Sequence, residues 1–245
     1  MRPLRLVLLA LCALALTSGW ASSARAQTST DGRIDVVQVN GLIDPANAAL
    51  IRSSLRDAER VQSTVVVFQM DASGAVDVDV DRLLEEFTHA SVPVAVWVGP
   101  SGGGARGAAA LLARSADVAA VANGAHLGSV DPVRYDDPSF KVSAPLKDVT
   151  TRSATLGDFI VSLDGRTVQT ANGPVKLSTA KVVELNGRPT REARGEVHFH
   201  KLGLTAQVAH TLDGPWVAYF LFVAGLALII FEFFTAGVGI AGLLG

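Results

Sequence analysis

A glycine-rich stretch at residues 98–113 is the part of the chain whose residue types best suit chemistry. It reads VGPSGGGARGAAALLA and begins at the end of the apolar run VPVAVWV. Many α/β proteins hold a phosphate group or a nucleophile where a strand passes through a tight glycine turn into a helix. Phosphate binding and nucleophilic catalysis are therefore both candidate functions of this turn.

A phosphate-binding loop is poorly supported. A P-loop needs Gly-Lys-Ser/Thr at the helix start, because the lysine meets the phosphates and the hydroxyl binds Mg²⁺. This chain has Arg106-Gly107-Ala108 there, and it lacks the acidic ribose partner of dinucleotide-binding folds. A plain glycine turn that lets the helix pack close to the sheet is favoured over nucleotide binding, and we expect no cofactor.

Alternating acids at Asp77, Asp79 and Asp81 resemble a calcium loop at first sight. An EF-hand loop starting at Asp77 needs glycine at its sixth position and glutamate at its twelfth, where this chain has Arg82 and Thr88. The acids therefore fit better in the first turn of a helix, where they complement the helix dipole.

Histidine and cysteine offer little for metal binding. His198 and His200 would share one face of a strand, but no third ligand lies nearby in the sequence. The only cysteine is Cys12, inside a predicted signal peptide. We expect no metal site, disulfide or thiol nucleophile in the mature protein.

Both ends of the chain are apolar. The first 26 residues have a positive start, a short apolar core and a small-residue cleavage site (Ala24-Arg25-Ala26), as in a secretory signal peptide. Residues 216–234 contain one charged side chain, Glu232, and nineteen helical residues extend about 28 Å, which is close to a bilayer core. We predict a membrane span there, followed by an apolar tail that we expect to be truncated rather than re-entrant.

The region between the two ends is predicted to be an α/β domain. The chain has 245 residues and a formal net charge of −2, which does not suggest a nucleic-acid surface. Apolar strands and helical segments alternate up to about residue 133, which favours a mainly parallel sheet with crossover helices. A helix is predicted to start at Asp44-Pro45. From about Ser153 the pattern is typical of short strands, with a hairpin turn at Asn172-Gly173.

Five ordered motifs resemble those of the NfeD-type membrane-bound serine proteases, whose outer domain has a ClpP/crotonase-like fold. The motifs are VNGLIDPANAALIRSSLRDAE, VVVFQMDASGAV, SVPVAVWVGPSGGGARGAAALLARSADVAAVANGAHLGSVDPV, LDGRTV and FEFF. The resemblance implies an α/β fold of repeated β–α units, a small β segment and a C-terminal transmembrane helix. We expect a signal peptide at 1–26, the ClpP/crotonase-like domain at 27–152, a β-rich membrane-proximal segment at 153–213 and a transmembrane region at 214–245.

The resemblance also identifies the glycine-rich stretch as a nucleophile turn. Active relatives read roughly P-S-G-A-R-A-A-S-A-G, with the second serine as the nucleophile. Alignment from Pro100 without a gap puts Gly107 at that position and Ser101 at the earlier serine. The turn whose amides help to form the oxyanion hole corresponds to Ser73-Gly74-Ala75, without the family's proline and second glycine.

The general base of the family also has no clear counterpart. Active relatives carry a helical lysine between the PV motif and LDGRTV, but here only about thirty residues separate Val133 from Leu163, and they show no helical period. Lys141 and Lys147 lie in no matching context. A serine–lysine dyad needs a hydroxyl beside an amine with a lowered pKa, and glycine has no hydroxyl.

The resemblance therefore implies a catalytically degenerate, membrane-anchored protein that acts as a scaffold or partner-binding module. An active serine endopeptidase that cleaves apolar segments of membrane proteins is the alternative, with Ser101 as a displaced nucleophile assisted by Lys141 or Asp71. A structural envelope protein that binds through its β segment is a third possibility. A stomatin-like membrane partner and homo-oligomerisation are implied by the resemblance. The predicted signal peptide and membrane span lead us to expect a cell-membrane location with residues 27–213 outside the cytoplasm.

Overall fold

A computed structural model describes residues 32–203 and 215–235 of the chain. The predicted signal peptide with Cys12 and the predicted apolar tail after Thr235 lie outside the described residues. The expected domain boundaries at 152/153 and 213/214 stay predictions.

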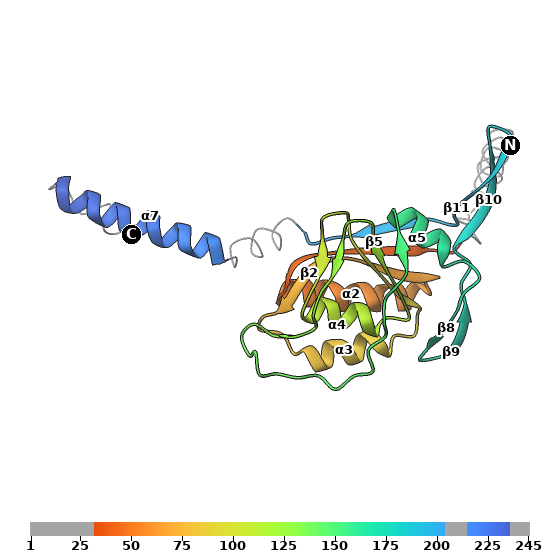
Figure 1. The fold of residues 1–245 in the computed structure, drawn as a ribbon, viewed down its shortest axis with the longest axis horizontal. Coiled ribbons are helices and arrows are strands. Elements are labelled where there is room, and N and C mark those ends of the chain that lie inside the picture. The colour runs from red at the N-terminus through yellow and green to blue at the C-terminus, as the bar shows by residue number, and fades with distance from the viewer. Residues whose placement is uncertain (1–31, 204–214, 236–245) are drawn as a thin grey trace, which may run out of the picture. The chain divides into compact units, whose positions relative to one another are not determined.

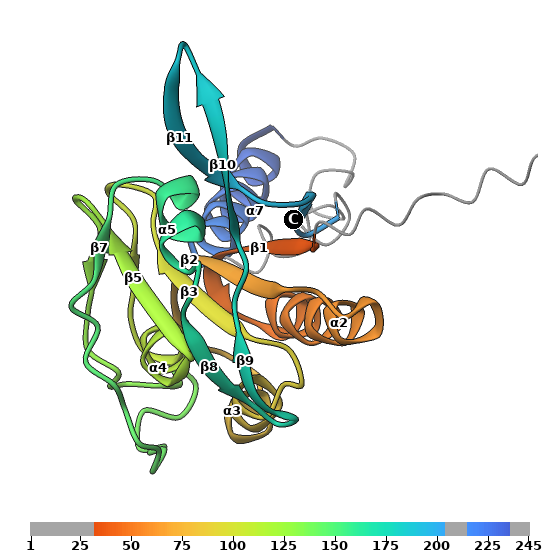
Figure 2. The same cartoon turned by 90° about the vertical axis from the view of Figure 1, so that its right-hand side faces the viewer.

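A parallel sheet forms the centre of the fold (Figures 1 and 2). In spatial order its main strands are β12 (Val197–His200), β1 (Ile34–Ile43), β2 (Val65–Ala75), β3 (Val94–Val98), β5 (Val118–Ala122) and β7 (Arg152–Ser153). A short branch joins it beyond β2, made of β4 (Gly104–Ala105) and β6 (His126–Leu127). Every residue of β3 is buried, which explains its unbroken apolar sequence. The predicted α/β class with a parallel sheet is confirmed.

Helices α2 (Pro45–Val61), α3 (Val80–Thr88) and α4 (Ala108–Ser115) lie together on one face of the sheet, and α5 (Leu156–Ser162) lies apart from them (Figure 1). Helix α2 starts as predicted, because the Asp44 carboxylate accepts a hydrogen bond from the Asn47 amide at 2.8 Å and Pro45 takes the first helical position. Asp79 caps α3 in the same way by accepting from the Arg82 amide. Asp79 and Asp81 therefore serve the helix start as expected, whereas Asp77 lies before the helix, where its amide donates to Asp136.

The core lies between the sheet and these helices. Phe68 of β2 and Phe87 of α3 are fully or almost fully buried, and their ring centroids are 5.1 Å apart. Phe159, Ile160 and Leu163 from the α5 region belong to the same buried cluster. The later part of the chain thus contributes to the core of the sheet.

Two hairpins follow α5: β8 (Thr167–Thr170) with β9 (Gly173–Lys176), and β10 (Ala180–Leu185) with β11 (Arg188–Ala193). The predicted first hairpin is confirmed, although Thr170 pairs with Gly173 and the turn residues are therefore Ala171 and Asn172. Strand β12 then returns to the sheet and pairs in parallel with β1.

A buried carboxylate links β12 to β1. The side chain of Asp35 is 1% exposed and accepts hydrogen bonds from Arg33, from the Ser63 hydroxyl and from His200, whose Nε2 lies 2.7 Å away. Burial alone would raise the pKa of Asp35, but the hydrogen bonds from Arg33, Ser63 and His200 outweigh it, so the pKa lies below its ordinary value. His200 is therefore a structural residue at the sheet edge.

Helix α7 (Pro215–Thr235) contains the predicted membrane span. Its side chains are described from Val217 to Phe231, and most large apolar ones are exposed, including Tyr219, Phe220 and Phe222. Among the described residues, no helix has both the length and the hydropathy needed to cross a bilayer. The predicted transmembrane helix is not confirmed.

Candidate functional site

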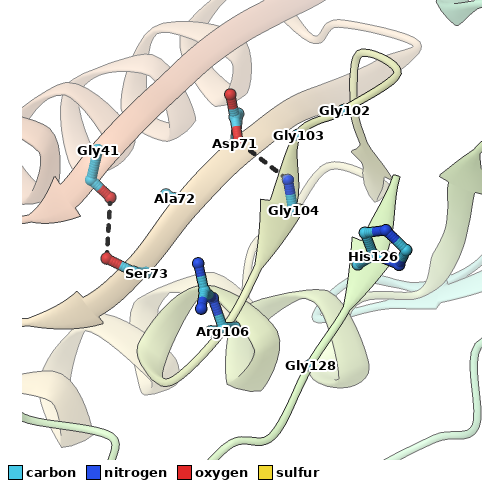
Figure 3. A pocket seen from close by; sticks show the side chains of 10 residues that line it. All are labelled: Gly41, Asp71, Ala72, Ser73, Gly102, Gly103, Gly104, Arg106, His126 and Gly128. Atoms are coloured by element: carbon cyan, nitrogen blue, oxygen red, sulfur yellow. Dashed lines mark hydrogen bonds between the residues drawn. The ribbon is translucent and has the colours of Figure 1, made fainter. Parts of the chain in front are cut away.

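A cleft of about 600 Å³ opens where β2 meets the β4–β6 branch (Figure 3). Five of its ten lining residues are glycines, so much of its wall is bare backbone. Polar side chains reach it from β2, from Arg106 directly after β4 and from β6. Its lining comprises Gly41, Asp71, Ala72, Ser73, Gly102, Gly103, Gly104, Arg106, His126 and Gly128.

The amides of the glycine turn are already occupied. The Gly102 amide donates to the Gly124 carbonyl at 3.1 Å, and the Gly103 amide donates to the Pro100 carbonyl at 2.9 Å. The Gly104 amide donates to Oδ1 of Asp71 at 2.9 Å (Figure 3). A phosphate cradle needs such amides free and pointing at the ligand. The expectation of a plain structural turn fits this geometry better than an anion-binding loop.

Close packing explains why glycine is required in this turn. A Cβ at position 103 would lie 2.8 Å from Oδ1 of Asp71, and a Cβ at position 104 would lie 2.9 Å from the His126 carbonyl oxygen. The turn therefore packs against the Asp71 carboxylate of β2.

Gly107, which the resemblance puts at the nucleophile position, is the N-cap of α4. Its backbone has φ 55° and ψ −128°, a left-handed value of φ that is costly for any residue other than glycine. Some α/β enzymes hold a nucleophile on a sharp, strained strand-to-helix turn of this kind. The backbone at Gly107 thus retains the form of such a turn.

The space that a side chain at position 107 would need is filled. A Cβ there would lie 2.6 Å from the Pro132 carbonyl oxygen and 2.7 Å from the Gly74 Cα. Both obstacles are backbone atoms, which cannot rotate away as the end of a side chain can. The Gly107 amide is also engaged, since it donates to the Ser129 carbonyl at 2.8 Å.

The predicted oxyanion-hole-like residues, Ser73-Gly74-Ala75, lie at the end of β2. The segment around Val133 covers them: the Ala75 amide donates to the Val133 carbonyl at 2.8 Å, and the Tyr135 amide donates to the Ala75 carbonyl at 2.8 Å. A Cβ on Gly74 would lie only 3.0 Å from Cε1 and Cζ of the Tyr135 ring, so this ring packs directly against Gly74. One amide of the predicted oxyanion hole is thereby bound to the chain itself.

The other proposed catalytic residues are not brought together. Ser101 is exposed in the turn after β3 and is absent from the cleft lining. Lys141 forms an exposed ion pair with Asp131 at 2.7 Å, and Lys147 donates to the Ala116 carbonyl at 2.8 Å. Within the described part of the chain, no serine hydroxyl is hydrogen-bonded to a lysine amine.

Sequence reasoning missed the two basic side chains of the cleft, Arg106 and His126. Figure 3 shows Arg106 rising from the start of α4 into the space between β2 and β6. Arg106 stood out in the sequence only as part of a triplet, Arg106-Gly107-Ala108, that does not match the P-loop motif. His126 had none, because a two-residue strand shows no period.

The histidine pair of β12 has structural contacts. Nε2 of His198 lies 3.2 Å from Glu196, and His200 contacts Asp35. Among the residues described, no three metal-ligating side chains lie close enough to hold an ion.

Comparison with known proteins gives a fold but no sequence relative. No family model and no curated protein matches this sequence. The 1510-N membrane protease specific for a stomatin homolog from Pyrococcus horikoshii matches with a TM-score of 0.57 and 12% identity, over 75% of this chain and 99% of that chain.

Two variants of the 1510-N membrane-bound stomatin-specific protease match as well. A lysine-to-alanine variant in complex with a substrate peptide has a TM-score of 0.54 and 13% identity, over 75% of this chain and 98% of that chain. A serine-to-alanine variant has a TM-score of 0.50 and 12% identity, over 71% and 98%. The α/β part of the expected fold is therefore confirmed: this chain has a fold similar to that of these membrane-bound proteases, which supports the resemblance to the NfeD-type family.

Proposed function

We propose that this chain is a catalytically degenerate relative of the NfeD-type serine proteases that acts as a scaffold or partner-binding module at a membrane. The single observation that carries the proposal is the filled space at Gly107. An acyl-enzyme needs an attacking side chain, and the backbone atoms of Pro132 and Gly74, 2.6 and 2.7 Å from the position of its Cβ, leave too little room for one.

The surroundings of Gly107 support the same proposal. The amide of Gly107 donates a hydrogen bond to the Ser129 carbonyl, and the amide of Ala75 donates one to the Val133 carbonyl. Neither amide is therefore free to stabilise an oxyanion. Residues 128–151 contain no helix that could present a lysine, and Lys141 and Lys147 are engaged elsewhere.

The membrane and partner parts of the proposal have separate support. The exposed apolar side chains of α7 favour contact with a lipid phase or with another apolar helix. The structural neighbours are described as specific for a stomatin homolog, which favours a stomatin-like membrane protein as the partner. Homo-oligomerisation and an extracytoplasmic outer domain are parts of the proposal.

Labelling of the purified full-length chain with a fluorophosphonate probe tests the proposal against an active protease. We expect no labelling of the wild-type chain and no turnover of apolar peptides. Labelling that disappears in Ser101→Ala would show that Ser101 is a nucleophile and would overturn the proposal. Labelling that survives in Ser101→Ala but tracks the protein through chromatography would overturn it as well.

A further inference from the structure

We propose that the cleft binds a carboxylate carried by an extended peptide, and that Arg106 is the residue that recognises it. This inference deepens the proposed partner-binding function and rests on it. A partner segment with an acidic side chain or a free C-terminus would place its carboxylate against the Arg106 guanidinium.

Arg106 lies where it can meet a ligand in the cleft. It is exposed, it lines the cleft, and its side chain points into it (Figure 3). Within the described residues, its guanidinium forms no hydrogen bond or ion pair, whereas Arg33, Arg52 and Arg134 are all paired with carboxylates. A guanidinium offers a planar fork of donors that matches a carboxylate.

The fold makes room for the side chain of Arg106 at Gly128. A Cβ on Gly128 would lie 2.6 Å from Cγ and 3.3 Å from Cδ of Arg106. The stem of Arg106 therefore lies directly over the backbone at Gly128, and any larger residue there would push it aside. The Gly128 amide donates to the Ala105 carbonyl at 2.8 Å, which holds the two backbones in register.

Asp71 is the acidic residue in the same cleft lining. Asp71 has one oxygen bound to the Gly104 amide, and no ion pair joins it to Arg106 in the described residues. A bare anion such as phosphate would bring negative charge toward Asp71 without compensation. A peptide can offer a backbone N–H to Asp71 and a carboxylate to Arg106, so it suits both charges.

The shape of the cleft fits the same class of ligand. Its volume is about 600 Å³, and the glycines at 41, 102–104 and 128 leave about half of its lining as bare backbone. An extended backbone can approach bare backbone closely, whereas a bulky folded surface cannot enter a cleft of this size.

Fluorescence anisotropy on the full-length chain in detergent tests the proposal with three labelled hexa-alanine probes. One ends in a free carboxylate, one ends in an amide, and one ends in an amide but carries a central glutamate. We expect the amide without glutamate to bind at least about tenfold more weakly than one of the carboxylate probes, because charge-assisted hydrogen bonds are the strong ones. Binding of only the free-end probe identifies a C-terminal carboxylate, and binding of only the glutamate probe identifies an acidic side chain.

Variants tie the effect to Arg106. Arg106→Ala should remove the difference between carboxylate and amide probes, and Arg106→Lys should keep part of it. Gly128→Ala leaves Arg106 in the chain but displaces its stem, so it should weaken carboxylate binding while the melting temperature stays close to that of the wild type. Arg56→Ala, which removes an exposed arginine of α2 outside the cleft, is the matched control and should have no effect.

Equal binding of all three probes, or a carboxylate preference that persists in Arg106→Ala, would overturn the inference. Inorganic phosphate that competes as well as the carboxylate peptide would overturn it too, because it would make the site a simple anion site. Mass spectrometry of the recovered probes separates this inference from the proposed function. Cleaved probes would contradict the degenerate site, whereas intact probes with no carboxylate preference would contradict only the role of Arg106.

Discussion

Gly102 and Gly107 both have a positive φ, but they differ in the space around the missing Cβ. Comparing substitutions at the two positions therefore separates the cost of backbone strain from the cost of a steric clash. Gly102 has φ +85° and open space around its missing Cβ, whereas Gly107 has φ +55° and backbone atoms within 3 Å of it. Gly102→Ser should therefore cost about 1–2 kcal/mol of unfolding free energy, from the backbone conformation alone. Gly107→Ser should cost clearly more, because its Cβ also displaces the backbone at Pro132 and Gly74.

Restoring the hydroxyl at position 107 should not restore peptide hydrolysis. Chemical denaturation measures the two free energies of unfolding, and a fluorophosphonate probe measures the reactivity of the serine. A Gly107→Ser variant that is as stable as Gly102→Ser, or that reacts with the probe, would show that the space at position 107 is available after all.

The buried Asp35 makes a residue-level prediction about pH. Its pKa in the folded chain is below the ordinary value of 3.8, so the stabilisation that it provides is present above that value and is lost as pH falls through the folded-state pKa. Asp35→Ala should lower the free energy of unfolding by about 3 kcal/mol or more at pH 7, because Arg33 loses its buried partner. The difference from the wild type should shrink below about pH 4.

Asp57→Ala provides the matched control for Asp35. Asp57 forms an ion pair with Arg60 at 3.0 Å, but both side chains are at least half exposed. Such pairs contribute little, so this variant should stay within about 1 kcal/mol of the wild type at every pH. Denaturant titrations between pH 3 and 7 give both profiles, and a loss at Asp35 that did not depend on pH would contradict the assigned charge.

At the scale of elements, the glycine turn depends on one side chain of β2. Asp71→Ala removes the acceptor of the Gly104 amide, so that amide should exchange with solvent faster and the chain should lose about 1–3 kcal/mol. Asp71→Asn retains an acceptor oxygen and should protect the amide nearly as well as the wild type. Hydrogen exchange followed by mass spectrometry on the 98–107 peptide checks both variants, and unchanged exchange in Asp71→Ala would contradict this role.

Elements with strong local patterns were predictable, and those fixed by distant contacts were not. The strand Ile34–Ile43 and the start of α2 at Asp44-Pro45 follow from apolar residues and a capping signal that lie next to each other in the sequence. The pairing of β12 with β1 joins residues such as Ile34 and Val197, which lie far apart in the sequence, through only four residue pairs. No local sequence pattern predicts this pairing.

The site shows the same division. The motif order pointed to Gly107, and the backbone there has the strained form that a nucleophile turn requires. The direction of Arg106 depends on Gly128, which lies more than twenty residues later and comes beside it only through the pairing of β4 with β6. Sequence spacing could therefore locate the turn but not the charge that faces the cleft.

For the whole molecule, the proposal of membrane association depends on exposed apolar side chains in two different places. Helix α7 exposes Phe220, Phe222 and Ile229 by 63%, 68% and 49%. Strands β10 and β12 expose Val182, Leu185 and Phe199 by 67%, 55% and 62%. Both sets present comparable apolar surface, but only the first belongs to a long helix of continuous apolar sequence.

Replacing the residues of each set by serine therefore distinguishes lipid binding through α7 from non-specific adsorption of any exposed apolar surface to lipid. The α7 variant with Phe220, Phe222 and Ile229 changed should lose most of its flotation with phosphatidylcholine vesicles, since each buried apolar side chain contributes about 1.5–3 kcal/mol to transfer out of water. The variant with Val182, Leu185 and Phe199 changed should float like the wild type. Because all six side chains are largely exposed, the sheet core is untouched and both variants should keep the wild-type melting temperature. Equal flotation of the two variants would mean that α7 does not attach the chain to lipid, and the membrane part of the proposed function would then have to be abandoned.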